Sequence, residues 1–154
     1  MDKHVQHEFW AAFAESPFIM MRLEGADQHS EPMTAMLDPS ARHAIWFFAA
    51  KDNRIAAGGS AMGQVATKDH RVFACIKGTL SEETDRAVRE KHWDNHVEAW
   101  FPKGREDPNV LMLRLDIGDS EVWVADLSDD CRKKLRTGEP ITPREAGEHA
   151  VGAV

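Results

Sequence analysis

The sequence is poor in features that would each point to a particular class of protein. It has only two cysteines among 154 residues, Cys75 and Cys131, and they form no CxxC pair. This argues against a disulfide framework and predicts a reduced, cytoplasmic protein. No apolar run approaches the roughly 20 residues of a membrane helix, and the N-terminus has no apolar signal core. We therefore expect neither a membrane anchor nor export.

Positive charge is also scarce. Lysine and arginine together number 19 against 26 acidic residues, which gives a net charge of −7. Nucleic-acid binding proteins usually carry a basic excess, so we expect no nucleic-acid partner. A single phosphate held in a local basic pocket is still compatible with this balance. The length and the 42% hydrophobic content predict one domain, residues 1–154, around a single core.

The hydrophobic pattern predicts a mainly β protein with a few helices. An apolar face at helical spacing predicts a helix over residues 2–15. Alternating or short apolar runs predict strands at residues 18–23, 30–37, 44–49, 60–67, 71–80, 110–117 and 120–126. A second helix is expected from an N-cap at Ser81 to about Trp93, with helical spacing resuming to Trp100. About seven short strands, mostly in hairpins, favour an antiparallel barrel or sandwich over a Rossmann fold.

Residues typical of turns and helix caps mark the ends of several of these elements. Residues 51–57 predict a short helical turn ended by Gly58-Gly59, and Gly118-Asp119 predicts a turn between the last two strands. In the tail, Ser128 is an N-cap for a short helix with basic residues at its end. Residues 142–145 form a capping box. Residues 127–154 are therefore predicted to be a C-terminal helical extension.

Most of the possible site motifs are weak. The glycine-rich stretch AAGGSAMG lacks the order of a dinucleotide loop and indicates a helix end followed by a strand. His92 and His96 are spaced to share one helical face, but no third ligand is indicated. We interpret them as part of a solvated face and predict no metal site. No nucleophile with its base, and no acid/base pair, is indicated.

The stretch IWFFAAKDNR, residues 45–54, allows two interpretations. It can be a core strand followed by a charged turn. It can also be a binding site in which Lys51 and Arg54 hold a phosphate while the aromatics contact a flat ring. The composition of the stretch does not choose between them.

Several motifs together resemble one known family. The stretches HSEPM, IWFFAAKDNR, KGTLSEETD and above all EAWFPKGREDPNVLMLRLDIGDSEVWVAD are similar to the general stress protein branch of the pyridoxamine 5'-phosphate oxidase-like, FMN-binding split-barrel family. The resemblance runs from about Phe9 to Asp126. It implies an antiparallel split β-barrel of six or seven strands. It also implies a homodimer that binds FMN in clefts between its subunits.

The resemblance also implies a set of cofactor-binding residues. These are Glu31, Pro32, Met33, Trp46, Phe47, Lys51, Arg54, Trp100 and Trp123. The family usually has an arginine for the flavin phosphate where this chain has Glu31. Its phosphate-binding turn usually carries hydroxyl residues and a lysine, and the matching stretch here, residues 50–54, keeps positive charge but has no hydroxyl. On the neighbouring strand, Arg22 is the expected partner of Glu31. Lys51 and Arg54 then remain to hold the phosphate.

The first functional hypothesis is a cytoplasmic FMN-binding protein, and any enzymatic activity would be that of a flavin-dependent oxidoreductase. The alternative is a family member that has lost FMN and serves as a dimeric binding or structural module. True pyridoxamine phosphate oxidase activity is a third and weaker hypothesis. The substrate and the electron partner are not indicated by the sequence.

Overall fold

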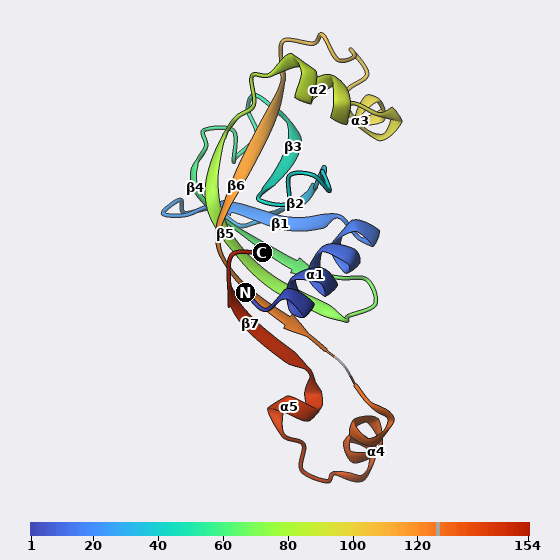
Figure 1. Cartoon of the computed structure of the whole chain (residues 1–154). Helices are drawn as coiled ribbons and strands as arrows, with labels where there is room; N and C mark the ends of the chain where they lie inside the picture. Colours follow the sequence, from blue (N-terminus) through green and yellow to red (C-terminus); the bar gives the residue numbers. More distant parts are fainter. Residues whose placement is uncertain (126) are drawn as a thin grey trace.

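The computed structural model of the chain describes residues 1–125 and 127–154. Within these residues the chain forms five helices and seven strands (Figure 1). The helices are α1 (Lys3–Glu15), α2 (Arg86–His92), α3 (Asn95–Trp100), α4 (Asp129–Thr137) and α5 (Pro143–Ala146). The strands are β1 (Phe18–Leu23), β2 (Glu31–Thr34), β3 (Ala44–Ala50), β4 (Gly59–Ala66), β5 (Val72–Glu82), β6 (Val110–Val124) and β7 (Glu148–Gly152).

All strand pairs are antiparallel, in the order β2-β1-β4-β5-β6-β3, with β7 added beside β6. β5 runs along one edge of the long strand β6. The other edge of β6 is shared by β3 in its first half and β7 in its second half. The sheet curves around α1, and α2 and α3 lie at one end of it (Figure 1). The predicted mainly β, antiparallel architecture is confirmed.

The main core forms where α1 lies against the curved sheet. α1 buries an apolar face that includes Phe9 and Phe13, whose rings stack with centroids 5.4 Å apart. These rings join Ile45, Phe47 and Leu113 in one cluster of buried side chains. Full burial of each large apolar side chain contributes about 1.5–3 kcal/mol, so this cluster is the main source of fold stability.

A second, smaller core lies under α2 and α3. Trp46 and Phe48 of β3 and Met112 of β6 pack there against Trp93 and Val97. The two clusters explain why β3 is buried along nearly its whole length. Successive side chains on a strand point to opposite faces, and here both faces are covered. For the same reason Met112 of β6 is fully buried.

The prediction of a helix capped by Ser81 is wrong at its start. Ser81 and Glu82 continue β5, where they pair with Arg114 and Leu113 of β6. The helix begins four residues beyond the strand, at Arg86, and Asp85 caps it by accepting a hydrogen bond from the Ala87 N–H at 2.8 Å. The ladder hydrogen bonds of a long strand outweigh a local cap signal.

The turn predicted at Gly118-Asp119 is also wrong, because β6 is continuous through it. The signal has a physical cause, since the register shifts there: Ile76 pairs with Ser120, but Gly78 pairs with Ile117. Two steps along β5 therefore match three along β6, which is a β-bulge. The strand changes its second partner from β3 to β7 in this region. The end of the predicted strand at Asp126 lies outside the described residues.

Three further elements differ from the sequence-based prediction. Residues 51–57 form consecutive hydrogen-bonded turns and no helix. β2 is shorter than residues 30–37, although Met36 still makes an isolated bridge with Trp46. The predicted helical extension contains α4 and α5 but ends in a strand, β7, that returns to the sheet.

The two helices of the extension project from the lower end of the body (Figure 1). Both cap predictions for this part are confirmed: the Ser128 side chain accepts from the Cys131 N–H, and Thr142 and Glu145 form the capping box. None of the helices in the described part of the chain combines the length and apolarity needed to cross a membrane.

Candidate functional site

The pocket with the most apolar walls lies between α3, the end of β3 and the start of β2. Its volume is about 490 Å³. Its walls come from four segments of the chain and consist of Phe18, Pro32, Met33, Thr34, Met36, Phe48, Ala49, Ala50, Asn53, His96, Val97, Trp100 and Phe101. Only Thr34, Asn53 and His96 among them carry polar side chains. Apolar walls with a few polar groups are typical of sites for flat organic ligands.

A larger hollow of about 720 Å³ lies between α1, the β4–β5 turn and the extension, but its character is different. Charged side chains line it and contact each other: Glu8 pairs with Arg71, and His4 lies 3.9 Å from Glu148. Because these charged side chains already pair with each other, few of them are free to bind a ligand. We therefore place the candidate site in the apolar pocket.

The alternation of β3 positions the back wall of this pocket. Phe48 points away from the main core, toward α3, and meets Trp93 edge-on with ring centroids 5.2 Å apart. Val97 of α3 is buried against the same cluster and fixes the helix over the strand. Trp100, one turn further along α3, is left 79% exposed at the pocket rim. Phe18, on the opposite wall, is 59% exposed.

The two predicted aromatics of β3 lie outside the pocket. Phe47 is fully buried in the main core, and Phe48 takes the position at the wall. Trp46 lies in the second core, where its indole N–H donates to Glu83 at 3.1 Å and the Arg114 guanidinium lies 5.7 Å from its ring. The sequence-based prediction assigned Trp46 and Phe47 together to the flavin ring. The alternation of the strand instead points them to opposite faces of β3.

His92 and His96 do not share one helical face, because α2 ends before Trp93 and α3 starts after Asp94. His92 is buried and stacks on Trp46 with ring centroids 5.0 Å apart. Burial lowers the pKa of His92, and the nearby Asp38 carboxylate opposes this shift only in part. His96 instead lines the pocket.

No group of three or more His, Cys, Asp or Glu side chains arranged to hold a metal ion occurs within residues 1–125 and 127–154. The prediction that this protein binds no metal stays a prediction.

An ion pair lies next to two residues of the pocket wall, Pro32 and Asn53. The Arg54 Nε lies 3.2 Å from a carboxylate oxygen of Glu31, and its Nη1 donates to the His29 carbonyl at 2.9 Å. The expected pairing of Glu31 with Arg22 is wrong: Arg54, from the turn after β3, takes that place. The other oxygen of Glu31, Oε1, is buried and has no hydrogen-bond partner among the described residues.

The remaining predicted residues divide between the pocket and other places. Pro32, Met33 and Trp100 line the pocket. Lys51 is exposed in the turn between two lining residues, Ala50 and Asn53. Trp123 lies in the second half of β6, where it stacks on His149 of β7 with centroids 5.1 Å apart. Within one chain Trp123 therefore does not reach the pocket.

Sequence reasoning missed several wall residues. Phe48 was detectable, because it follows Trp46 by two and must share its face of the strand. His96 precedes Trp100 by four, so helical spacing places both on one side of α3. Phe18 and Met36 carried no local signal, since only the pairing of β1 with β2 and the Met36–Trp46 bridge bring them here.

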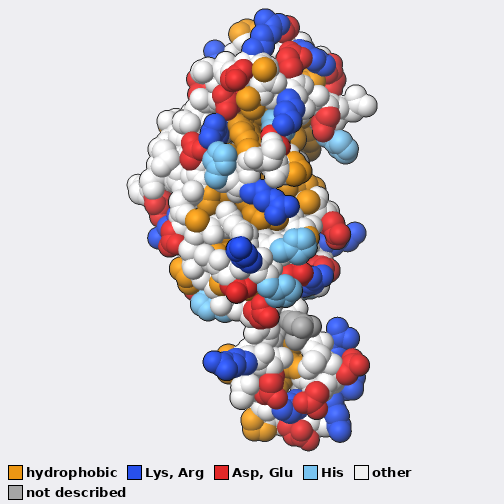
Figure 2. Space-filling view, in the orientation of Figure 1, with side chains coloured by type: hydrophobic (Ala, Val, Ile, Leu, Met, Phe, Trp, Pro, Cys, Tyr) orange, Lys and Arg blue, Asp and Glu red, His pale blue; other side chains and the backbone are white. Residues whose placement is uncertain are grey.

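Figure 2 shows hydrophobic side chains gathered on one face of the body, between the α2–α3 end and α1, with charged groups around them. No acid/base pair or nucleophile dyad is evident among the described pocket residues. The pocket can therefore hold and shield a flat ring, but a bound cofactor would have to supply any redox chemistry.

Comparison with known proteins agrees with this picture. Residues 2–136 match the family described as pyridoxamine 5'-phosphate oxidase like. No curated protein is significantly similar in sequence.

Solved structures share the whole architecture. The structure of the general stress FMN/FAD binding protein from Xanthomonas citri is 37% identical, with a TM-score of 0.76, over 82% of this chain and 93% of that one. A candidate general stress protein 26 from Jannaschia sp. CCS1 is 26% identical and has a TM-score of 0.81, with 98% of both chains covered. The fold is thus the split barrel of these proteins.

The matched residues span most of the chain, and the shared architecture includes the strands that build the pocket. The chain belongs to the pyridoxamine 5'-phosphate oxidase-like family, and its relatives of known structure include general stress proteins.

Proposed function

We propose that this protein binds a flavin in the apolar pocket, and that a second copy of the chain completes the cleft. The observation that carries the proposal is the pocket itself. Its walls are mostly apolar, and the exposed ring of Trp100 stands at the open rim. The Xanthomonas citri relative, described as FMN/FAD binding, supports the same class of ligand.

The pocket residues fit the ring of FMN better than its phosphate. Phe48, Met33 and Trp100 offer apolar contacts for the isoalloxazine ring. Thr34 and Asn53 can hydrogen-bond to its polar edge or to the ribityl chain. Of the two cations at the turn, Arg54 is paired with Glu31. Lys51 enters no ion pair among the described residues and is therefore available for a phosphate. When bound, a flavin would supply electron transfer, and the chain would orient it and exclude water.

An incomplete rim supports the homodimer. Trp100 and Phe18 expose large apolar surfaces at the mouth of the pocket, and such surfaces commonly mark interfaces. We expect a dimer that buries more than about 2,000 Å² in total. Sedimentation equilibrium at micromolar concentration measures this directly, and a monomer would remove the two-subunit cleft from the proposal.

A titration with FMN, FAD, haem and pyridoxal phosphate tests the function, read by flavin fluorescence quenching and by the rise in melting temperature. We expect saturable binding of a flavin and no comparable response to haem or pyridoxal phosphate. A ligand present well above its Kd should stabilise the protein, by about 2.7 kcal/mol at a hundredfold excess over Kd. Absence of any flavin response would contradict the proposal.

The second candidate function is a dimeric binding module without FMN, and the Glu31 carboxylate favours it. A negative group next to the pocket residue Pro32 opposes a phosphate-bearing cofactor. Under this alternative the pocket takes another flat ligand and the purified protein is colourless. Release of a yellow flavin by acid from freshly purified protein would contradict the alternative.

We propose a cytoplasmic location from the cysteines. Both are free thiols, with Cys75 half-buried and Cys131 buried. Neither therefore depends on an oxidising compartment. Fractionation of the native host, with antibodies against this chain, measures the compartment.

A further inference from the structure

The turn after β3 leaves few free donors for a phosphate group. The backbone N–H of Lys51 donates to the Asn109 carbonyl at 2.9 Å, and that of Asn53 donates to the Ala50 carbonyl at 3.0 Å. The N–H of Ile55 is taken by the Asn53 side chain at 3.0 Å. Ala49 and Ala50, at the wall of the pocket, have no hydroxyl to offer. A phosphate cradle requires free N–H or O–H groups, and here many are engaged or missing.

Arg54, whose guanidinium could pair with a phosphate, already contacts other groups of the chain. Arg54 contacts two acceptors of the chain, Glu31 and the His29 carbonyl. Binding a phosphate would require Arg54 to leave both, or to share itself with Glu31 next to a dianion. The second choice brings two negative groups together, which is unfavourable in a partly buried site.

The buried oxygen of Glu31 requires a hydrogen-bond donor, which a phosphate group is unable to provide. Glu31 Oε1 accepts no hydrogen bond among the described residues, and a buried acceptor without a donor destabilises its surroundings. A hydroxyl group of a ligand can supply the missing donor. A phosphate dianion cannot, since it only accepts.

From these three observations we infer that the pocket selects a flavin with an uncharged, hydroxyl-bearing tail, so that riboflavin binds at least as tightly as FMN. This inference rests on the proposed flavin site. The ring would occupy the apolar walls, and the ribityl hydroxyls would face the Glu31–Arg54 pair. The neutral Glu31–Arg54 pair beside the pocket residues Pro32 and Asn53 would then decide the class of ligand.

The test compares riboflavin and FMN by fluorescence quenching and by calorimetry with the same full-length protein. We expect the wild type to bind riboflavin with a Kd equal to or below that for FMN. In Glu31→Gln the negative charge is gone and Arg54 is released. FMN should then bind at least about tenfold more tightly, an effect of about 1.4 kcal/mol. Riboflavin affinity should change less than about threefold.

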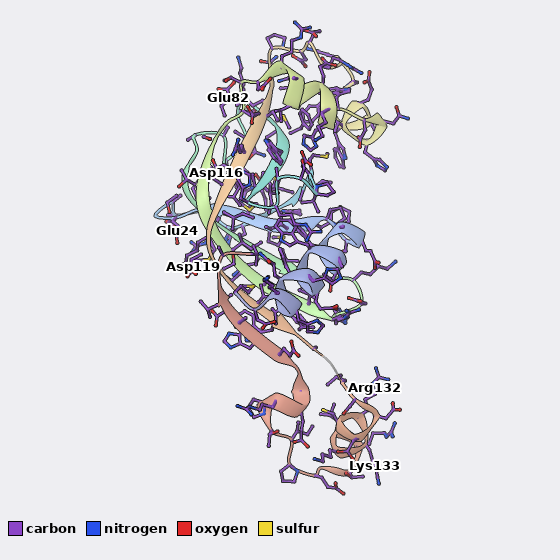
Figure 3. All side chains as sticks on the ribbon, in the orientation of Figure 1. Glu24, Glu82, Asp116, Asp119, Arg132 and Lys133 are labelled. Carbon is purple, nitrogen blue, oxygen red and sulfur yellow. The ribbon has the colours of Figure 1, made fainter. Side chains whose placement is uncertain are left out.

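Two further variants give the comparison its controls. Asp119→Asn removes the same charge from an exposed site in β6, and Asp119 lies far from α3 (Figure 3). It should leave both affinities unchanged, so net charge alone is not responsible. Arg54→Gln added to Glu31→Gln should erase the gain for FMN, because the freed guanidinium is what contacts the phosphate.

The outcomes separate the inference from the proposed function. Binding of FMN more than about threefold tighter than riboflavin in the wild type overturns the inference but leaves the flavin site standing. An equal change for both ligands in Glu31→Gln also overturns it, because Glu31 then does not act on the tail. Absence of binding by either flavin overturns the proposed function, and the inference with it. Riboflavin binding by Glu31→Gln also verifies that this variant is folded.

Discussion

The two faces of β3 carry similar residues but have different roles. Ile45 and Phe47 point into the main core and are completely sealed. Trp46 and Phe48 point the other way, into a smaller cluster that α2 and α3 cover. On that side the cover ends at Trp100, and a pocket remains open. One face of β3 thus belongs to the sealed main core, and the other forms part of the wall of the candidate pocket.

This difference shows that burial alone does not identify a function. Phe47 and Phe48 are neighbours and both are almost completely buried. What distinguishes them is the packing on each side: a helix and a closed sheet against Phe47, and a short, incomplete cover over Phe48.

Substitution of the two phenylalanines should separate stability from binding. Phe47→Ala should lower the free energy of unfolding by about 3–5 kcal/mol, because it leaves a closed cavity. Phe48→Ala should cost less, about 2–3 kcal/mol, since its cavity opens into an existing pocket. Phe48→Ala should weaken flavin binding, whereas folded Phe47→Ala should retain it. Urea unfolding and fluorescence titration measure the two effects, and equal stability losses would contradict the distinction.

Removal of the exposed aromatic at the rim should affect binding more than folding. Trp100→Ala should change the stability of a single subunit by less than about 0.5 kcal/mol, because within one subunit the ring packs on little. It should raise the Kd for riboflavin about fivefold, which corresponds to about 1 kcal/mol of lost aromatic contact. Leu135→Ala is the matched control, since Leu135 is 60% exposed on α4, away from the pocket. A similar loss of affinity in Leu135→Ala would contradict the role of Trp100.

Lowering the pH should lower the free energy of unfolding through His92, which packs on the pocket-facing side of β3. Burial lowers its pKa in the folded state, so the neutral ring is favoured there. The groups beside it are Trp46, on which it stacks, Asp38, which favours its charge, and Lys91, which opposes it. The stability that it contributes is complete above its ordinary pKa near 6.5 and is lost as pH falls through the lower, folded-state value.

The melting temperature between pH 5 and pH 8 measures this effect. His92→Phe keeps a ring on Trp46 and removes the titration, so its profile should be flatter than that of the wild type. His7→Asn, at an exposed position of α1, should keep the wild-type profile. An unchanged slope in His92→Phe would show that other groups cause the acid sensitivity.

Zinc should have the smallest effect. His92 and His96 lie on separate helices, and His92 is occupied by its stack on Trp46. Added zinc should therefore leave the melting temperature unchanged within error. Stoichiometric zinc in protein purified without added metal, and its loss in His96→Ala, would contradict this prediction.

Much of the fold was predictable because local rules and tertiary packing agree. The helical spacing of Phe9 and Phe13 predicted α1, and the run from Phe18 to Leu23 predicted β1 with its observed bounds. Errors occurred where local and long-range signals compete. Ser81 is a good helix cap, yet the β5–β6 ladder extends through it. Gly118-Asp119 has the residues of a turn, yet it lies within β6 at a β-bulge.

The candidate site was predictable only in part, for the same reason. The motif around Pro32 and Met33 and the position of Trp100 lead to the pocket. The choice of Phe48 over Phe47 needed the covering helices, and Phe18 needed strand pairing. The partner of Glu31 depended on which cation the β3 turn brings close, and that turn is 20 or more residues away in the chain.

The antiparallel β character, α1 and the caps of α4 and α5 were predictable from the sequence, because periodicity and side chains near their own backbone act within a few residues. The family was indicated by the resemblance of several motifs to those of known proteins, and the match over residues 2–136 shows it. The tertiary structure was needed to decide which face of β3 is sealed and which opens into a pocket. It also decided that Arg54 neutralises Glu31 and that β7 returns to β6. Such features depend on contacts between distant segments, whose free energy comes from packing and charge in three dimensions.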